Sequence, residues 1–332
     1  MTVQQLDVIG FGNAIVDVLA RTEDAFLDRQ GMRKGGMTLI DEARAETVYS
    51  SMGPGVEISG GSAANTMVGV AALGGQAGFI GKVRDDELGG IFAHDIRAAG
   101  VTYATPPAGS GPATARCLIL VTPDGERTMN TYLGAAQDLG PADVDEATVA
   151  AATVTYLEGY LWDPPAAKEA FLKASGVAHK AGRTVSLTLS DAFCVGRYRA
   201  EFLDLMRKGV VDLVFANEAE LMSLYETDFD TALAQLRADA KRAVVTRSEK
   251  GALSMTADEL VSVPAFPVAK VVDTTGAGDL FAAGYLHGFS RGFDAEDCLK
   301  LGALCASEII SHIGARPERK LKEFALENGL RV

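Results

Sequence analysis

The stretch of the chain with the clearest chemical potential is residues 271–284, which read VVDTTGAGDLFAAG. A β-rich run ends in a turn of small residues, Gly276, Ala277 and Gly278, and an apolar helix follows. Amides at a helix start lack intrahelical partners and lie at the positive end of the helix dipole, so this turn predicts an anion site built without a cation. Asp279 follows in the first helical turn, where a carboxylate can orient and deprotonate a hydroxyl that attacks phosphorus.

A second constellation lies near the start of the chain. The run Gly60-Gly61-Ser62-Ala63-Ala64-Asn65 follows a predicted strand at 56–59, and its two glycines permit a close-approach turn. Asn65 then lies one helical turn further on and faces the same cleft. Asp17 follows the first predicted strand. A carboxylate there that accepts hydrogen bonds from two vicinal hydroxyls would recognise ribose specifically.

Neither standard nucleotide-binding motif is present. Gly10-Phe11-Gly12 lacks the third glycine of a dinucleotide fingerprint, because position 15 is Ile15. Gly81-Lys82 is not a phosphate-binding P-loop, because Val83 replaces Ser or Thr and Gln76 replaces the first glycine. The absence of a dinucleotide fingerprint therefore argues against a hydride-transferring enzyme.

The run 271–284 resembles the C-terminal signature of the ribokinase-like (PfkB) family of carbohydrate and nucleoside kinases. This resemblance implies that Asp279 is the catalytic base, that Gly276, Ala277 and Gly278 stabilise the transferring phosphoryl group, and that Arg127 adds a positive contact. It extends along nearly the whole chain, in order, and implies ATP and Mg²⁺ as cofactors.

The resemblance also implies the binding residues. The sugar hydroxyls are expected to meet Asn13, Asp17, Gly60, Gly61 and Asn65. The nucleotide end comprises Asn217, Glu220, Thr246, Ser248 and Gly251, with Glu220 supporting Mg²⁺ through water. Asn217-Glu218-Ala219-Glu220 also reads as a helix capping box, and both interpretations are compatible. A monovalent cation, K⁺, is expected near Asp273 and Thr275. Ser248 stands where the family usually has Gly.

Several stretches are similar to the adenosine kinase branch of this family. Gly12-Asn13…Asp17 resembles its opening motif, and Leu187–Phe193 resembles a segment whose Phe packs on the substrate's purine, which implies this role for Phe193. The departures are Asp191 and Ala192 in place of Ala and Pro. The reaction expected is transfer of the γ-phosphoryl group of ATP to the 5′-hydroxyl of adenosine. A sugar kinase for ribose, fructose or a keto-deoxy sugar acid stays open, as does a non-catalytic nucleotide-binding regulator.

The elements that must position these residues follow an alternating order. After residue 150, strands at 154–157, 184–189, 212–215 and 243–246 alternate with predicted helices, which indicates parallel strands with right-handed crossovers. Residues 115–122 and 128–133 predict an antiparallel hairpin around Pro123-Asp124-Gly125. We expect one α/β domain over 1–332, a three-layer α/β/α sandwich with a mostly parallel central sheet, and a small β-sheet lid from about 13–40 and 101–134.

Composition limits the partners. The 332 residues include 31 Lys and Arg against 44 Asp and Glu, a net charge of −13, which disfavours nucleic acid and anionic membranes. Four scattered Cys and four scattered His predict neither a disulfide framework nor a zinc site. No signal peptide and no run long enough to span a membrane is present, so we expect a cytoplasmic protein, monomer or homodimer, that acts on a small nucleoside or sugar.

Overall fold

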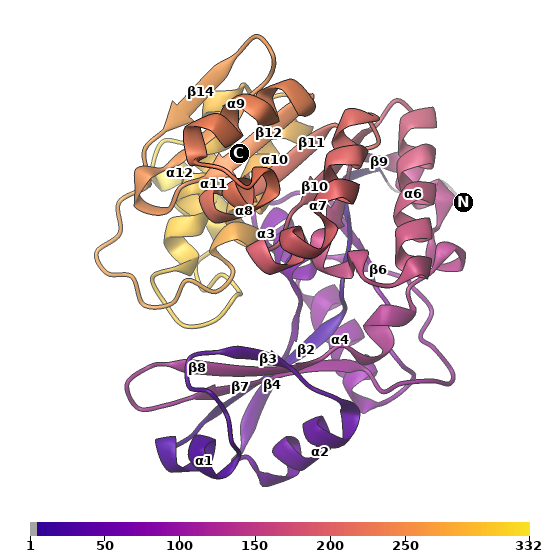
Figure 1. Cartoon of the computed structure of the whole chain (residues 1–332), viewed down its shortest axis with the longest axis vertical. Coiled ribbons are helices and arrows are strands. Elements are labelled where there is room, and N and C mark those ends of the chain that lie inside the picture. Colours follow the sequence, from indigo (N-terminus) through magenta and orange to yellow (C-terminus); the bar gives the residue numbers. More distant parts are fainter. Residues whose placement is uncertain (1–4) are drawn as a thin grey trace.

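The computed structural model describes residues 5–332 and contains a large mixed sheet covered by helices on both faces, with a small sheet beneath it (Figure 1). Within those residues, the large sheet has nine strands in the order β14-β13-β12-β11-β10-β9-β1-β5-β6. Pairing is parallel from β6 through to β12, and β13 and β14 add on antiparallel. The predicted α/β sandwich with a mostly parallel sheet is confirmed.

The strands of the large sheet are rich in β-branched and aliphatic residues, as expected for strands buried on both faces. Their bounds are β1 Leu6–Phe11, β5 Ala77–Ile80, β6 Thr102–Tyr103, β9 Ala152–Glu158, β10 Thr184–Thr188, β11 Leu213–Asn217, β12 Arg242–Thr246, β13 Ala252–Met255 and β14 Leu260–Val263.

Two layers of helices bury the large sheet, each over its own apolar cluster. One cluster packs side chains of α5 Glu146–Ala151, α6 Pro165–Lys180, α7 Ala192–Arg207, α8 Glu218–Tyr225 and α9 Phe229–Asp239 against the sheet. The other face carries α3 Ser62–Ala72, α4 Glu87–Ala98, α10 Ala277–Ser290, α11 Ala295–Ile309 and α12 Leu321–Glu327. Short 3₁₀ turns lie at Gly134–Asp138, Pro141–Asp143, Gly159–Trp162 and Ser248–Lys250. No helix in the described part of the chain is long and apolar enough to cross a membrane.

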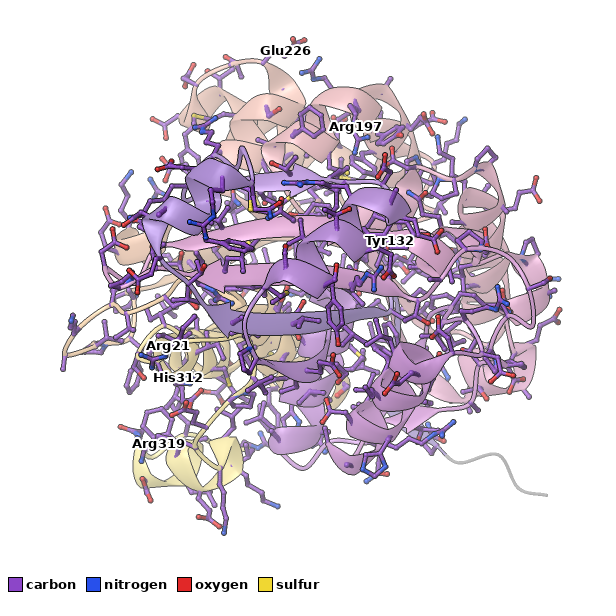
Figure 2. The ribbon with its side chains drawn as sticks, turned by 90° about the horizontal axis from the view of Figure 1, so that it is seen from below. Arg21, Tyr132, Arg197, Glu226, His312 and Arg319 are labelled. Atoms are coloured by element: carbon purple, nitrogen blue, oxygen red, sulfur yellow. The ribbon has the colours of Figure 1, made fainter. Side chains whose placement is uncertain are left out.

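The small sheet has the order β3-β8-β7-β2-β4, and Figure 2, seen from below, shows its strands side by side. Its strands are β2 Ile15–Arg21, β3 Met37–Leu39, β4 Gly55–Gly60, β7 Ala115–Val121 and β8 Arg127–Tyr132. Helices α1 Asp24–Arg29 and α2 Glu42–Ser51 lie on the side away from the large sheet (Figure 1). The predicted hairpin is present as β7 and β8.

The small sheet differs from the expected ranges 13–40 and 101–134 in two places. β4 lies outside both ranges, yet it pairs antiparallel with β2. Thr102–Tyr103 lies inside the second range, yet as β6 it extends the large sheet beside β5. Both pairings join segments far apart in sequence, so short-range patterns do not report them.

Candidate active site

The predicted site residues gather along one edge of the large sheet, where the carboxyl ends of its parallel strands meet. Glu158 ends β9, Asn217 ends β11, and Thr246 ends β12. Asn217 and Thr246 are register partners, so they lie side by side. The small sheet joins the large one at this same edge through β1–β2 and β4–α3. Ligands of open α/β sheets bind at this edge, and the topology therefore assembles the site there.

Asp279 is the third residue of α10 and is held by two donors from α3. Ser62 Oγ donates to Asp279 Oδ1 at 2.6 Å, and Asn65 Nδ2 donates to Asp279 Oδ2 at 3.1 Å. Burial raises the pKa of Asp279 to about 6, against the lowering effect of these two hydrogen bonds and of the Arg316 charge. The carboxylate is thus oriented by neutral donors and ionises just below neutral pH, as a general base requires.

The turn before Asp279 opens α10 with a left-handed residue. Gly276 is the N-cap, with φ of 78°, and the amide of Ala277 donates to Thr274 O at 3.2 Å. Ala277 was expected to contribute to the anion site together with Gly276 and Gly278, but its N–H is already used within the turn. A side chain at Gly278 would meet nothing within 4 Å, which leaves open space beside the helix N-terminus.

Asp17, on β2 of the small sheet, lies against the backbone at the start of α3. A Cβ at Gly60 would lie 2.3 Å from Asp17 Oδ2, so only glycine permits this approach. Gly61 has φ of 97°, and a Cβ there would lie 2.2 Å from the carbonyl oxygen of Asn13. Burial raises the pKa of Asp17 to about 6, and the negative charge of Asp279 adds to this shift. The Asp17 and Asp279 carboxylates therefore interact electrostatically.

Asn13 is buried and contacts a residue that the sequence analysis did not single out. Asn13 Nδ2 donates to Glu158 Oε1 at 2.7 Å, and the amide of Ala63 donates to Glu158 Oε2 at 2.8 Å. Glu158 is 1% exposed, and burial raises its pKa to about 7. It ties the segment after β1 to the first turn of α3. Its place at the end of a predicted strand, directly before Gly159, is the signal that could have identified it.

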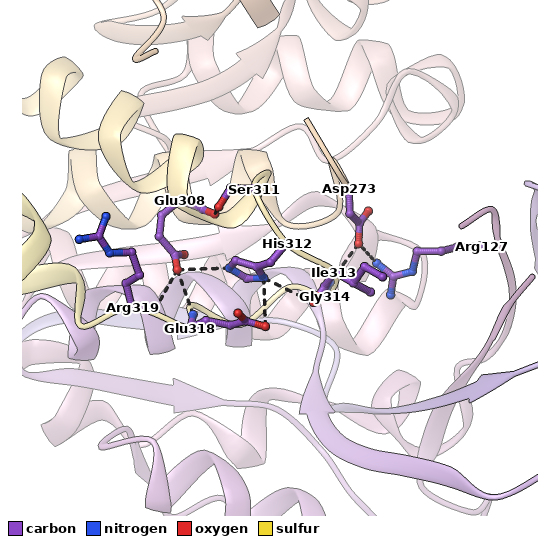
Figure 3. A network of polar contacts seen from close by, with 9 residues as sticks. All are labelled: Arg127, Asp273, Glu308, Ser311, His312, Ile313, Gly314, Glu318 and Arg319. Carbon is purple, nitrogen blue, oxygen red and sulfur yellow. Dashed lines mark hydrogen bonds and ion pairs between the residues drawn. The ribbon is translucent and has the colours of Figure 1, made fainter. Parts of the chain in front are cut away.

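Arg127, on β8, connects the small sheet to the turn before α10. Its Nη1 forms an ion pair with Asp273 Oδ2 (Figure 3). The same nitrogen donates to Thr275 Oγ1 at 2.9 Å. Asp273 Oδ2 also accepts from the amide of Gly314 at 3.0 Å. Although burial opposes it, the hydrogen bonds from Gly314 and Thr275 lower the pKa of Asp273. The Asp273 carboxylate is thus occupied by protein donors, and a K⁺ site near it stays a prediction for the backbone carbonyls.

Asn217 and Glu220 form the predicted capping box at the start of α8. Asn217 Oδ1 accepts from the amide of Glu220 at 2.8 Å, and Glu220 Oε2 accepts from the amide of Asn217 at 3.0 Å. Glu220 is 4% exposed; burial, reinforced by the charge of Asp191, raises its pKa to about 7. A cation bound here would stabilise the ionised form of the buried Glu220 carboxylate.

The turn Thr246–Gly251 follows β12 at the same edge. Ser248 has φ of 51°, so it adopts the left-handed conformation that the Gly usual at this position provides without strain. A Cβ at Gly251 would lie 2.0 Å from the carbonyl oxygen of Val263. Arg247 packs its guanidinium 4.1 Å from the Phe229 ring centroid. The turn is therefore formed despite the substitution.

Phe193 lies in the first turn of α7, at the edge where β10 ends. Its side chain is 69% exposed, and the Arg197 guanidinium lies 4.8 Å from its ring centroid. The stacking of a purine on Phe193 stays a prediction.

Comparisons with known proteins agree with the resemblance to the ribokinase-like family. The model of the pfkB family carbohydrate kinases matches residues 40–321. The chain belongs to the PfkB family. It is 56% identical to the structure of a probable sugar kinase from Rhizobium etli, with a TM-score of 0.92 and coverage of 98% of this chain and 99% of that one. It is equally identical to the structure of adenosine kinase from Sinorhizobium meliloti, with a TM-score of 0.91 and coverage of 98% and 100%. The ATP-dependent ribose-1-phosphate kinase of Halopiger xanaduensis is 31% identical over 257 residues, 77% of this chain and 82% of that protein.

This PfkB-family chain is thus an ATP-dependent kinase of the nucleoside and sugar class, as its sequence predicted. The site fits MgATP chemically: Glu220 is a buried acid whose pKa is raised further by the charge of Asp191, and the space beside Gly278 is open. Within residues 5–332 no group of three or more His, Cys, Asp or Glu could hold a metal ion. Mg²⁺ commonly uses one or two carboxylates together with substrate phosphates and waters.

Proposed function

We propose that this PfkB kinase transfers the γ-phosphoryl group of ATP to the 5′-hydroxyl of adenosine. The observation that carries the reaction is the Asp279 carboxylate, fixed by Ser62 and Asn65 beside the opening of α10. Asp279 takes the proton from the acceptor hydroxyl, while the amides of Gly276 and Gly278 stabilise charge on the transferring group. Asn217 and Glu220 would hold Mg²⁺ through water, and the bound ion would supply positive charge to the phosphates.

The surface of the small sheet supports a nucleoside over a bare sugar. In its register, Asp17 lies opposite Cys117, Leu19 opposite Ile119, and Ile119 opposite Met129. Residues opposite or two apart share a face, so these apolar side chains share the face from which Asp17 and Arg127 point toward α10.

At the edge of the same face, Met37 and Leu39 are 50% and 51% exposed. A flat, apolar nucleobase would cover this surface, while Asp17 accepts from the ribose hydroxyls. The small sheet then acts as a lid over the acceptor, and Arg127 supplies a positive charge at its edge.

The proposed reaction is tested by Asp279→Asn. Loss of the base is expected to lower turnover by about three orders of magnitude, with adenosine binding retained by calorimetry. The matched control is Asp297→Asn, since Asp297 is likewise the third residue of its helix, α11. Turnover of Asp279→Asn near that of the wild type refutes the proposed base.

The proposed acceptor is tested by ADP release with adenosine, inosine, ribose, fructose and ribose 1-phosphate. Adenosine is expected to give the highest kcat/KM, and ³¹P NMR of the product is expected to show a 5′-phosphate. A higher kcat/KM for fructose or ribose refutes adenosine as the acceptor, and leaves the kinase reaction in place.

A further inference from the structure

Arg316 lies in the segment between α11 and α12 and reaches the junction between β4 and α3. Its Nε donates to the carbonyl oxygen of Ser59 at 3.0 Å, and its Nη1 donates to that of Ala64 at 3.3 Å. Nη2 donates to Ser59 Oγ at 2.8 Å and to the Ser59 carbonyl oxygen. The guanidinium fork thus spans the turn from the last residues of β4 to the first turn of α3.

This junction positions both acids of the site. It contains Gly60, against which Asp17 packs, and it leads directly into Ser62 and Asn65, the donors to Asp279. On its other side, Asp95 of α4 accepts from the amide of Ser59 at 2.8 Å and from Ser59 Oγ. Movement of the junction would therefore move the groups that orient both carboxylates.

The segment that carries Arg316 is itself anchored. Buried Glu308, in α11, accepts from the amides of Glu318 at 3.0 Å and Arg319 at 2.8 Å, and from His312 Nε2 at 3.2 Å (Figure 3). Gly314, two residues before Arg316, donates to Asp273. The guanidinium is thus held from a part of the chain about 250 residues away from the junction that it contacts.

The charge of Arg316 acts on the same two acids. Burial lowers the pKa of Arg316 to about 10, against the raising effect of Asp17, Asp95 and Asp279, so the side chain stays cationic at neutral pH. It opposes the effect of burial on the pKa values of Asp17 and Asp279. Other groups around Asp279 come from several elements: Ser62 and Asn65 on α3, Asp17 on β2, Tyr156 and Glu158 on β9, and Tyr160 after β9.

We propose that Arg316 is a positioning residue for phosphoryl transfer, which holds the β4–α3 junction and places a positive charge beside Asp17 and Asp279. The inference rests on the proposed function, because it takes Asp279 as the base. Arg316 supplies, from the C-terminal segment, a cation that favours the ionised form of both carboxylates, and on Asp17 it acts together with Arg127 against burial and the charge of Asp279. The base is then ready at neutral pH.

The test is the pH profile of kcat/KM for Arg316→Gln and Arg316→Met, with Arg316→Lys beside them. Removing the charge is expected to move the acidic limb upward by up to about one pH unit, because Arg316 influences the pKa of Asp279 less than burial and the hydrogen bonds from Ser62 and Asn65 do. Activity is then lost near pH 6 and recovers above pH 8. Arg316→Lys keeps the charge but not the fork, so its limb is expected at the wild-type pH with a lower kcat throughout.

Asp95→Asn is the matched control, because it loosens the same Ser59 contacts without removing the cation. Its limb is expected not to move upward. Thermal unfolding of every variant verifies that it is folded, and either neutral variant suffices for the test. An unmoved limb in a folded neutral variant overturns the proposal, as does an equal shift in Arg316→Lys. If Asp279→Asn keeps its turnover, it is instead the proposed base that fails.

Discussion

Replacing Ser62 by Ala is expected to change the pH at which this kinase becomes active. The Ser62 hydroxyl donates to Asp279 Oδ1 at 2.6 Å, and burial already raises the pKa of Asp279 to about 6. A hydrogen bond to a charged group contributes about 1.5 kcal/mol, and one pKa unit corresponds to about 1.4 kcal/mol. Loss of this donor therefore raises the pKa of Asp279 by about one unit, to about 7.

The consequence for activity follows from the ionised fraction of Asp279. At pH 6 this fraction falls from about one half to about one tenth, so kcat/KM is expected to fall about fivefold. At pH 8.5 Asp279 is ionised in both proteins, and kcat/KM is expected to stay within about 10% of the wild type. The sign follows from the proposed role of Asp279, since a base accepts a proton only when it is deprotonated.

The assay is ADP release with adenosine at intervals of half a pH unit from pH 5 to 9. The matched control is Thr66→Val, since Thr66 lies one turn further along α3 and donates to the Ser62 carbonyl oxygen at 3.1 Å. Its acidic limb is expected at the wild-type pH. A Ser62→Ala limb that does not move, or a loss equal at all pH values, would refute the reasoning.

Two further predictions concern stability. Gly276→Ala is expected to lower the free energy of unfolding by about 1–2 kcal/mol, because φ at Gly276 is 78° and the added Cβ lies 3.0 Å from Ala315. Urea unfolding measures this loss, with Gly278→Ala as the control, since a Cβ at Gly278 meets nothing within 4 Å. Equal urea midpoints for the two variants would contradict the prediction. Glu158 and Glu220 have pKa values raised by burial to about 7, above the 4.5 of the unfolded chain, so the stability that they contribute is present below pH 4.5 and is lost as the pH rises to 7. Burial lowers the pKa of His287 to about 4, so His287 makes the protein more stable as the pH rises. This single group opposes the two buried glutamates, whose combined effect is expected to be larger. The urea midpoint is expected to fall between pH 5 and 7.5, and less steeply in Glu220→Gln; a rising midpoint is the contrary result.

The sequence was sufficient to predict the site residues that interact with near neighbours in the chain. The turn Gly276–Gly278 and Asp279 lie within four residues, and the capping box of Asn217 and Glu220 spans one helical turn. Backbone amides at a helix start and a carboxylate one turn along interact through local geometry alone, which residue type and spacing determine. The alternation of strands and helices likewise predicted the parallel sheet.

Tertiary structure decided which distant groups meet. Glu158 joins Asn13 to Ala63, and Arg316 reaches Ser59 from the other end of the chain. β4 also joined the small sheet by pairing with β2, which no short-range pattern reports. Burial set the pKa values of these acids, and burial depends on how the whole chain packs. The sequence alone therefore determined the type of chemistry, whereas the fold determined the charges and hydrogen bonds that surround it.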